Sequence, residues 1–462
     1  MKKKLLITVT VILALALSVG ILAGCTESLK QKAIPTQMGG KVSGNGGMTV
    51  VYGDYLYFIN GYAGESADNT FGNVVKGSIA RVALKNGVPD GEATIIVPKK
   101  VYGTDTNYGG IYIVNDYIYY ATTSTDLDGD GKAKTSNGVI MRTKVDGTAT
   151  EVVAEFDSHS TVFKVVGDKL VYVRNNGIYS IDLNSKKFDV TTVEKSILTG
   201  YVMDDNYIYY NVYVDSDTSN YAMKVYPLAG GEAKTLLSAE IFGKTDVKYT
   251  FGIVSVIDEG DGVKVFYSKK DDAQGNPEEG FYATTFDKAT FAYSKDNEKR
   301  FTQNSSSTTN LNYTKFYKAG DYYLGYASTK LDAFNADGTR VQGTDAIRSL
   351  NVGSAITVFE IEQNENSVVL WYLDSNSVLR KITVLEKDGE EWKFVEGNET
   401  KIFSGKFSKS YTSIEKVGNV LYYFNSNVSD NAYYYVIDEE KPAEGKEKIL
   451  GIITQTDIIA AF

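Results

Sequence analysis

Short apolar stretches follow one another along most of the chain, and glycine, asparagine and aspartate separate them. One phrase returns: an apolar strand, a tight turn containing Gly, Asn or Asp, and a second strand rich in tyrosine. Its clearest copies occupy residues 51–58, 114–120, 166–172, 203–210 and 417–424, and weaker copies occupy residues 260–267, 320–326 and 366–371. Such an internal repeat indicates a fold built from one supersecondary unit.

A third apolar strand often follows the phrase, as at residues 77–82 and 138–143, and a fourth comes next, as at residues 93–97. Tyrosine and β-branched residues favour strands. Glycine, asparagine and aspartate tolerate the positive φ angles of tight hairpin turns. Each repeat is therefore predicted to form a four-stranded antiparallel meander.

Strands such as residues 55–58 are apolar on both faces, so both faces must be covered by other parts of the protein. Neighbouring sheets arranged in a closed ring provide this cover and leave only short edges. From Asp54 to Asn419 the copies span 365 residues, about 52 per interval, close to the length of known propeller blades. We predict an all-β fold, a β-propeller of four-stranded antiparallel blades. Eight copies predict eight blades, or seven if one weak copy is false.

The hairpin pattern G-D-x-I-Y-Y, followed by G-x-I-Y-R/S-x-D/N, resembles that of Tyr-rich bacterial propellers grouped as a family of unknown function. It is distantly similar to YWTD-type propellers as well. The similarity covers nearly all of residues 48–453. The resemblance implies the propeller fold and a location at the cell surface, and it supplies no catalytic residues.

The N-terminus has the layout of a signal peptide: Lys2, Lys3 and Lys4 precede an apolar run over residues 5–22. The run ends in Leu-Ala-Gly-Cys at residues 22–25, which resembles the lipobox of bacterial lipoproteins. That resemblance implies cleavage between Gly24 and Cys25, and attachment of lipid to Cys25. The alternative is an uncleaved transmembrane anchor, since the run approaches the ~20 residues that span a bilayer.

Three segments are therefore expected: a signal peptide at 1–24, a lipidated cysteine with a flexible Gly-rich tether at 25–47, and the propeller at 48–462. We expect a monomer that is lipid-anchored to a membrane on its extracytoplasmic face. Removing the three signal lysines leaves 45 basic and 58 acidic side chains, a formal charge of −13. This balance argues against nucleic acid as a partner.

The loop at residues 126–131 has the sequence Asp-Leu-Asp-Gly-Asp-Gly, which matches the first half of a calcium-binding loop. Asp126, Asp128 and Asp130 occupy positions one, three and five, from which oxygen ligands converge on one cation. Position twelve is Asn137 in place of the bidentate glutamate, which predicts weak affinity. The alternative is an acidic hairpin loop without metal.

No catalytic residues are predicted. The sole histidine, His159, stands beside serine and aspartate in sequence, whereas the members of a catalytic triad come from separate segments. Cys25 is the only cysteine, so the mature domain has no Cys-based nucleophile. Trp371 is expected in the core and Trp392 at a partly exposed position.

These observations favour a lipoprotein whose propeller binds a protein or glycan ligand, or acts as a scaffold, at the cell surface. Two alternatives remain open: a propeller enzyme acting on polysaccharide or peptide, and an accessory factor for envelope assembly. The Gly-x-Ser-x-Gly motif of an added α/β hydrolase domain is absent from the sequence.

Overall fold

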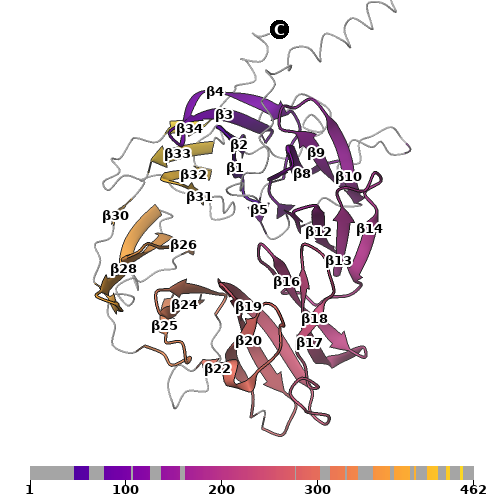
Figure 1. The fold of residues 1–462 in the computed structure, drawn as a ribbon, viewed down its shortest axis with the longest axis vertical. Helices are drawn as coiled ribbons and strands as arrows, with labels where there is room; N and C mark the ends of the chain where they lie inside the picture. Colours follow the sequence, from indigo (N-terminus) through magenta and orange to yellow (C-terminus); the bar gives the residue numbers. More distant parts are fainter. Residues whose placement is uncertain are drawn as a thin grey trace, which may run out of the picture.

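The computed structural model describes residues 46–61, 77–102, 104–105, 108–124, 129, 137–156, 162–275, 277–301, 313–327, 330–341, 357–374, 379–395, 400–401, 414–424, 433–437 and 448–450. These residues form strands and a single short 3-10 helix, η1 (Lys295–Asn297). Figure 1 shows the strands gathered into separate sheets that stand around a central axis.

The first half of the ring contains four sheets, each an antiparallel meander in chain order. Their strands are β1 (Thr49–Tyr52), β2 (Tyr55–Ile59), β3 (Ile79–Lys85) and β4 (Val88–Val97); β7 (Tyr112–Val114), β8 (Tyr117–Thr123), β9 (Gly138–Lys144) and β10 (Thr150–Phe156); β11 (Val162–Val166), β12 (Lys169–Arg174), β13 (Gly177–Asp182) and β14 (Val190–Glu194); β15 (Val202–Met203), β16 (Tyr207–Val214), β17 (Asp217–Pro227) and β18 (Lys234–Leu237). A separate two-stranded pair, β5 (Thr104–Asp105) and β6 (Tyr108–Gly109), precedes the second sheet.

The second half continues with four more sheets. Their strands are β19 (Tyr249–Glu259), β20 (Gly262–Asp271), β21 (Gly280–Asp287) and β22 (Glu298–Phe301); β23 (Lys315–Ala319), β24 (Tyr322–Ala327) and β25 (Lys330–Phe334); β26 (Thr357–Gln363), β27 (Ser367–Leu373), β28 (Leu379–Asp388), β29 (Glu391–Phe394) and β30 (Thr400–Lys401); β31 (Ile414–Val417), β32 (Val420–Phe424), β33 (Tyr433–Ile437) and β34 (Lys448–Leu450).

The protein is thus a β-propeller, and its described residues form eight blades, one for each predicted hairpin, the three weak copies included. In Figure 1 the first strand of each blade lies nearest the centre and the last lies toward the rim. Two blades depart from the predicted four strands. Among the described residues, blade six has three strands, extended by a bridge between Phe334 and Arg340. In blade seven, β29 and β30 pair with opposite ends of β28.

The tight turns between first and second strands have the predicted backbone. In blade one, Gly53 has φ +61°, and in blade two Asn115 and Asp116 have φ +51° and +64°. Only glycine adopts this left-handed region without cost, and asparagine and aspartate tolerate it better than other residues. These turns lie at one end of the ring, which we call the turn face. The opposite end, where second strands end and third strands begin (Asp271 and Gly280 in blade five), is the loop face.

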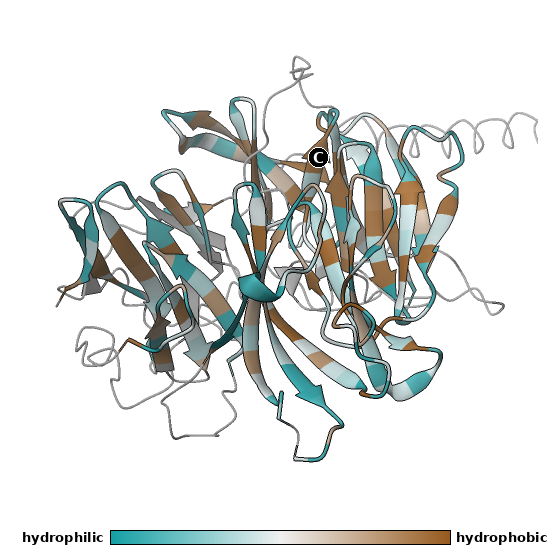
Figure 2. Ribbon diagram, turned by 60° about the horizontal axis from the view of Figure 1, so that its bottom comes forward, coloured by the Kyte–Doolittle hydropathy of each residue, from teal (hydrophilic) through white to brown (hydrophobic). Residues whose placement is uncertain are grey.

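Apolar side chains fill the spaces between neighbouring blades. One buried cluster joins Leu170 of blade three to Ile140 of blade two, and the next joins Ile208 of blade four to Ile178 of blade three. In Figure 2 hydrophobic residues, in brown, recur along the strands, and many of the turns at the strand ends are hydrophilic, in teal. Trp371 is fully buried, as predicted, and Trp392 is partly exposed.

The ring closes between blade eight and blade one without exchanging a strand. Val420 and Tyr422 of blade eight pack in one cluster with Val50 and Leu56 of blade one. In addition, the Glu415 carboxyl group accepts hydrogen bonds from the Met48 and Thr49 amides and from the Thr49 hydroxyl.

The N-terminal residues that lead into β1 are part of the ring. The Gly46 amide donates to the Ile111 carbonyl at 2.7 Å, and the Ile111 amide donates to the Gly47 carbonyl at 2.9 Å. Gly46 and Gly47, which the sequence assigns to the end of the tether, therefore lie against blade two. The described chain enters the ring at the loop face, because the start of β1 pairs with the end of β2.

Candidate functional site

Aromatic side chains gather on the loop face where blade four meets blade five. We call Tyr213, Tyr221, Phe242, Tyr249 and Tyr293 the aromatic patch. The rings form two groups: the ring centroids of Tyr213 and Tyr221 are 5.5 Å apart, and Phe242 contacts Tyr249 and Tyr293 at 5.0 and 5.1 Å.

The two halves of the aromatic patch come from different blades. Tyr213 and Tyr221 are paired residues of β16 and β17 in blade four. Phe242 lies in the connection from blade four to blade five, and Tyr249 begins β19. The Tyr249 amide donates to the Asn220 side-chain oxygen at 3.4 Å, which brings blade four against blade five.

The aromatic patch is open to solvent on its outer side. Tyr213 is 39% exposed, and Ile241, which precedes Phe242, is 40% exposed. Among the described residues, only four large apolar side chains are this exposed. The other two are Val152 and Val190, on the outer strands of blades two and three. Tyr249 is buried and supports the rings above it. A partly exposed tyrosine such as Tyr213 combines apolar area with a polar hydroxyl, a property common at binding surfaces.

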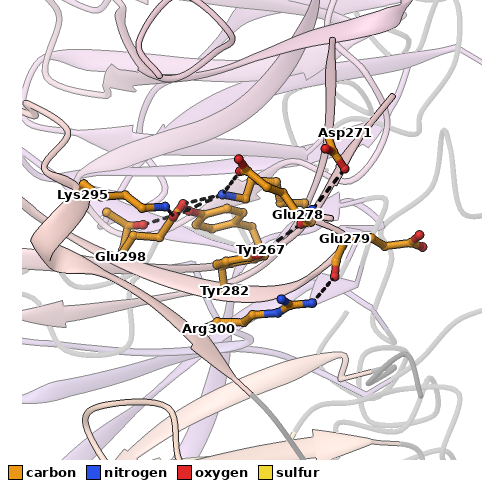
Figure 3. A network of polar contacts seen from close by, with 10 residues as sticks. Tyr267, Asp271, Glu278, Glu279, Tyr282, Lys295, Glu298 and Arg300 are labelled. Atoms are coloured by element: carbon orange, nitrogen blue, oxygen red, sulfur yellow. Dashed lines mark hydrogen bonds and ion pairs between the residues drawn. The ribbon is translucent and has the colours of Figure 1, made fainter. Parts of the chain in front are cut away.

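A buried ion pair in blade five contacts Phe242 of the aromatic patch. Figure 3 shows Glu298 of this pair with its neighbours. Lys269 of β20 and Glu298 of β22 have side chains that are 1% and 2% exposed, and the Lys269 Nζ lies 3.0 Å from Oε1 of Glu298. A second carboxylate, Glu278, lies 3.0 Å from the same Nζ. The ammonium group also lies 4.9 Å from the ring centre of Phe242, so it connects the ion pair to the aromatic patch.

Glu298 accepts further hydrogen bonds, and one more hydrogen bond ties the loop between β20 and β21 to the sheet. Tyr267 donates to Oε1 of Glu298 at 2.7 Å, and Lys295 lies 2.7 Å from its Oε2. The Tyr282 hydroxyl donates to the carbonyl of Glu278 at 3.1 Å, which fixes the loop between β20 and β21. The loop face of blade five is therefore a rigid support rather than a flexible surface.

The charges of this network decide what chemistry it supports. Burial alone would raise the pKa of Glu298, but hydrogen bonds from Lys295 and Tyr267 and the charge of Lys269 outweigh burial and lower it. A carboxyl group with a lowered pKa is ionised at neutral pH and cannot act as the general acid of glycoside cleavage. Glu298 is therefore held as an ionised partner of Lys269 and Lys295.

A second ion pair crosses the blade boundary at the rim of the aromatic patch. Lys248, next to Tyr249, lies 2.8 Å from Oδ2 of Asp217 in blade four. Hydrogen bonds from Lys248 and from Ser219 lower the pKa of Asp217 well below its ordinary value. Both side chains reach solvent, so this pair adds little to stability and mainly places charges beside the rings.

The residues singled out from the sequence lie elsewhere. Gly24, Cys25, Asp126, Asp128, Asp130 and His159 fall outside the described residues, so lipidation and calcium binding stay predictions. No cluster of three or more potential metal ligands occurs in the part of the chain that is described. Likewise, none of its helices is long and apolar enough to cross a membrane.

Sequence reasoning missed Lys269 and Glu298. For Lys269 a signal existed, because Val263, Val265, Tyr267 and Lys269 alternate along one strand and so share a face. Since three of these residues are apolar or aromatic, the fourth was a candidate for burial. For Glu298, in the short strand Glu-Lys-Arg-Phe, the sequence carries no such signal.

No family model matches this chain, and no curated protein matches it. Among solved structures it is similar to a eukaryotic initiation factor, with 9% identity, 92% of this chain and 91% of that chain covered, and a TM-score of 0.42. It is also similar to a prolyl endopeptidase, with 10% identity over 85% of this chain and a TM-score of 0.41, and it spans 55% of that chain's length. A putative TolB from Agrobacterium tumefaciens is 12% identical over 58% of this chain and 90% of that one, with a TM-score of 0.26. The fold assignment therefore rests on the sheets themselves.

Proposed function

We propose that this protein is a lipoprotein, anchored to a membrane through Cys25 on the extracytoplasmic side, whose propeller binds a protein or glycan ligand through its loop face. The observation that carries the binding function is the partly exposed aromatic patch, with Tyr213 and the adjacent Ile241 open to solvent, beside the buried Lys269–Glu298 pair. A rigid aromatic surface loses little side-chain entropy on binding, which favours affinity.

The position of the N-terminal segment supports a membrane-proximal ligand. Met48 enters the ring at the loop face, the same end that carries the aromatic patch. A flexible chain of the tether's length has an end-to-end distance of about 25 Å. The aromatic patch would then stay within reach of the membrane surface and of the polymers or proteins nearest to it.

The binding proposal predicts that Tyr213→Ser and Ile241→Ser each weaken ligand binding about tenfold, because each removes exposed apolar area from the centre of the contact. Pull-down from envelope membranes and a glycan array would first identify the ligand, and titration calorimetry would then give the dissociation constants.

The matched controls are Val190→Ser and Val152→Ser, which remove exposed apolar side chains from the outer strands of other blades. Both should bind like the wild type. If all four variants bind equally well, the ligand contacts another surface and the assignment to the aromatic patch is wrong.

The anchoring proposal predicts that Cys25→Ala moves most of the protein from the membrane fraction to the soluble fraction or leaves it unprocessed, because no acyl chains are attached. Metabolic labelling with a fatty acid, followed by fractionation, measures both effects. Wild-type protein that takes up no label while keeping its full length would instead identify residues 5–22 as an uncleaved membrane anchor.

A further inference from the structure

Two lysines flank one buried tyrosine on the turn face, between blades five and six. Lys264 of β20 is 5% exposed and Tyr323 of β24 is 2% exposed. The Lys264 Nζ lies 4.1 Å from the ring centre of Tyr323, and the Nζ of half-buried Lys318 lies 4.4 Å from the same ring centre. Both ammonium groups therefore approach a single ring, far from the aromatic patch on the loop face.

The hydrogen bonds in this group leave the buried ammonium incompletely satisfied. Lys264 donates one hydrogen bond, to the Tyr323 hydroxyl at 3.0 Å. The Tyr323 hydroxyl in turn donates its only hydrogen to Glu259. An ammonium group has three N–H donors, and burying a donor without an acceptor costs free energy.

The charges are also unbalanced. Among the described residues, neither Lys264 nor Lys318 lies within 4.0 Å of a carboxylate oxygen, because the salt bridges of blade five are formed by other lysines. Burial and the nearby positive charges of Lys318 and Lys299 lower the pKa of Lys264, and the negative charge of Glu259 opposes them only in part. A further negative charge would reduce this excess of positive charge.

We propose that Lys264, Lys318 and Tyr323 form a binding site for one singly charged oxyanion group, a carboxylate or a phosphodiester. Its oxygens accept hydrogen bonds from N–H groups of Lys264 and Lys318, and its negative charge adds to that of Glu259 in offsetting the lysines. Half-buried Lys318 lies on the solvent side of the site, so the ligand group enters past it. The protein has a net charge of −10, so these lysines form a local region of positive charge, which favours anionic ligands.

Titration calorimetry on the full chain tests the site with two probes, glucuronate for a carboxylate and dimethyl phosphate for a phosphodiester, against sodium chloride at equal ionic strength. Wild type should bind at least one probe with saturable heat. Lys318→Gln should raise the dissociation constant at least tenfold, because it removes one of two ammonium donors while its half-buried position keeps the fold intact. The probe with the lower dissociation constant identifies the source of the oxyanion.

The control is Lys315→Gln, three residues earlier in the same strand, where a lysine lies 4.9 Å from the ring centre of Tyr317. It should bind the probe like the wild type. Lys264→Met provides a second test if it folds, with binding lost. Saturable binding that is equal in wild type and Lys318→Gln, or absent from wild type for both probes, would overturn the proposal.

Discussion

Replacing Lys269 with methionine should lower the free energy of unfolding by about 3 kcal/mol, the lower end of the cost of breaking a buried ion pair. The substitution leaves the carboxylate of Glu298, 2% exposed, without its closest buried cation. Lys295 still pairs with Glu298 from the surface, which places the cost at the lower end. Urea unfolding followed by tyrosine and tryptophan fluorescence measures the change.

Lys270→Met is the matched control. Lys270 follows Lys269 directly, its side chain is 54% exposed, and its Nζ lies 3.6 Å from Oε2 of Glu279. Its cost should stay below about 1 kcal/mol. The double variant Lys269→Met/Glu298→Met should recover most of the lost stability, since apolar side chains of similar volume often replace a buried pair without loss. Equal stability of wild type and Lys269→Met would show that the pair contributes nothing.

The same pair gives the fold a pH dependence with a defined sign. The pKa of Glu298 is lower in the folded protein than its ordinary value of 4.5, so the unfolded chain binds more protons in this range. The stabilisation is complete above about pH 4.5 and is lost as the pH falls through the folded-state pKa. The double methionine variant should lose less stability than wild type between pH 5 and pH 3, as measured by urea unfolding at each pH.

The architecture of this protein was predictable because its signal is local. A turn such as Gly53-Asp54 and the tyrosine strand after it are neighbours in sequence, so each hairpin can be recognised alone. Even the weak copy at residues 320–326 forms the predicted turn and tyrosine strand, β24, which pairs with β23, because Gly320 still provides a positive φ angle at the turn. Counting such turns gave the number of blades.

The side-chain contacts between neighbouring blades could not be predicted, because they join residues that are distant in sequence. Phe242 of one connection packs over Lys269 of the following blade, and no pattern within either segment indicates that contact. The same holds for the turn face, where Glu259 and Tyr323 are hydrogen bonded across 64 residues. The sequence pattern around a charged strand residue is the same whether its side chain is exposed to water or buried against a neighbouring blade.

A contact of the same kind closes the ring, and we expect its loss to destabilise the fold. Glu415 and Thr49 are separated by 366 residues, and the Thr49 amide donates to the Glu415 carboxyl group at 2.7 Å. Glu415→Ala would leave the amides of Met48 and Thr49 without this acceptor. Each unsatisfied buried donor costs about 1–3 kcal/mol, so we expect a loss of about 3 kcal/mol in unfolding free energy.

Gly47→Ala tests the same contact from the N-terminal segment that precedes β1. A Cβ atom on Gly47 would lie 2.3–2.9 Å from the Glu415 carboxyl group, so the side chain or the N-terminal segment must move. We expect Gly47→Ala to destabilise the ring as well, and the double variant Gly47→Ala/Glu415→Ala to cost less than the sum of the single changes, because alanine at 415 removes the clash. Urea unfolding of the four proteins, with Glu390→Ala as an exposed control, gives the coupling energy. Strictly additive losses would mean that Gly47 and Glu415 act independently and that blade one is held to blade eight by its apolar cluster alone.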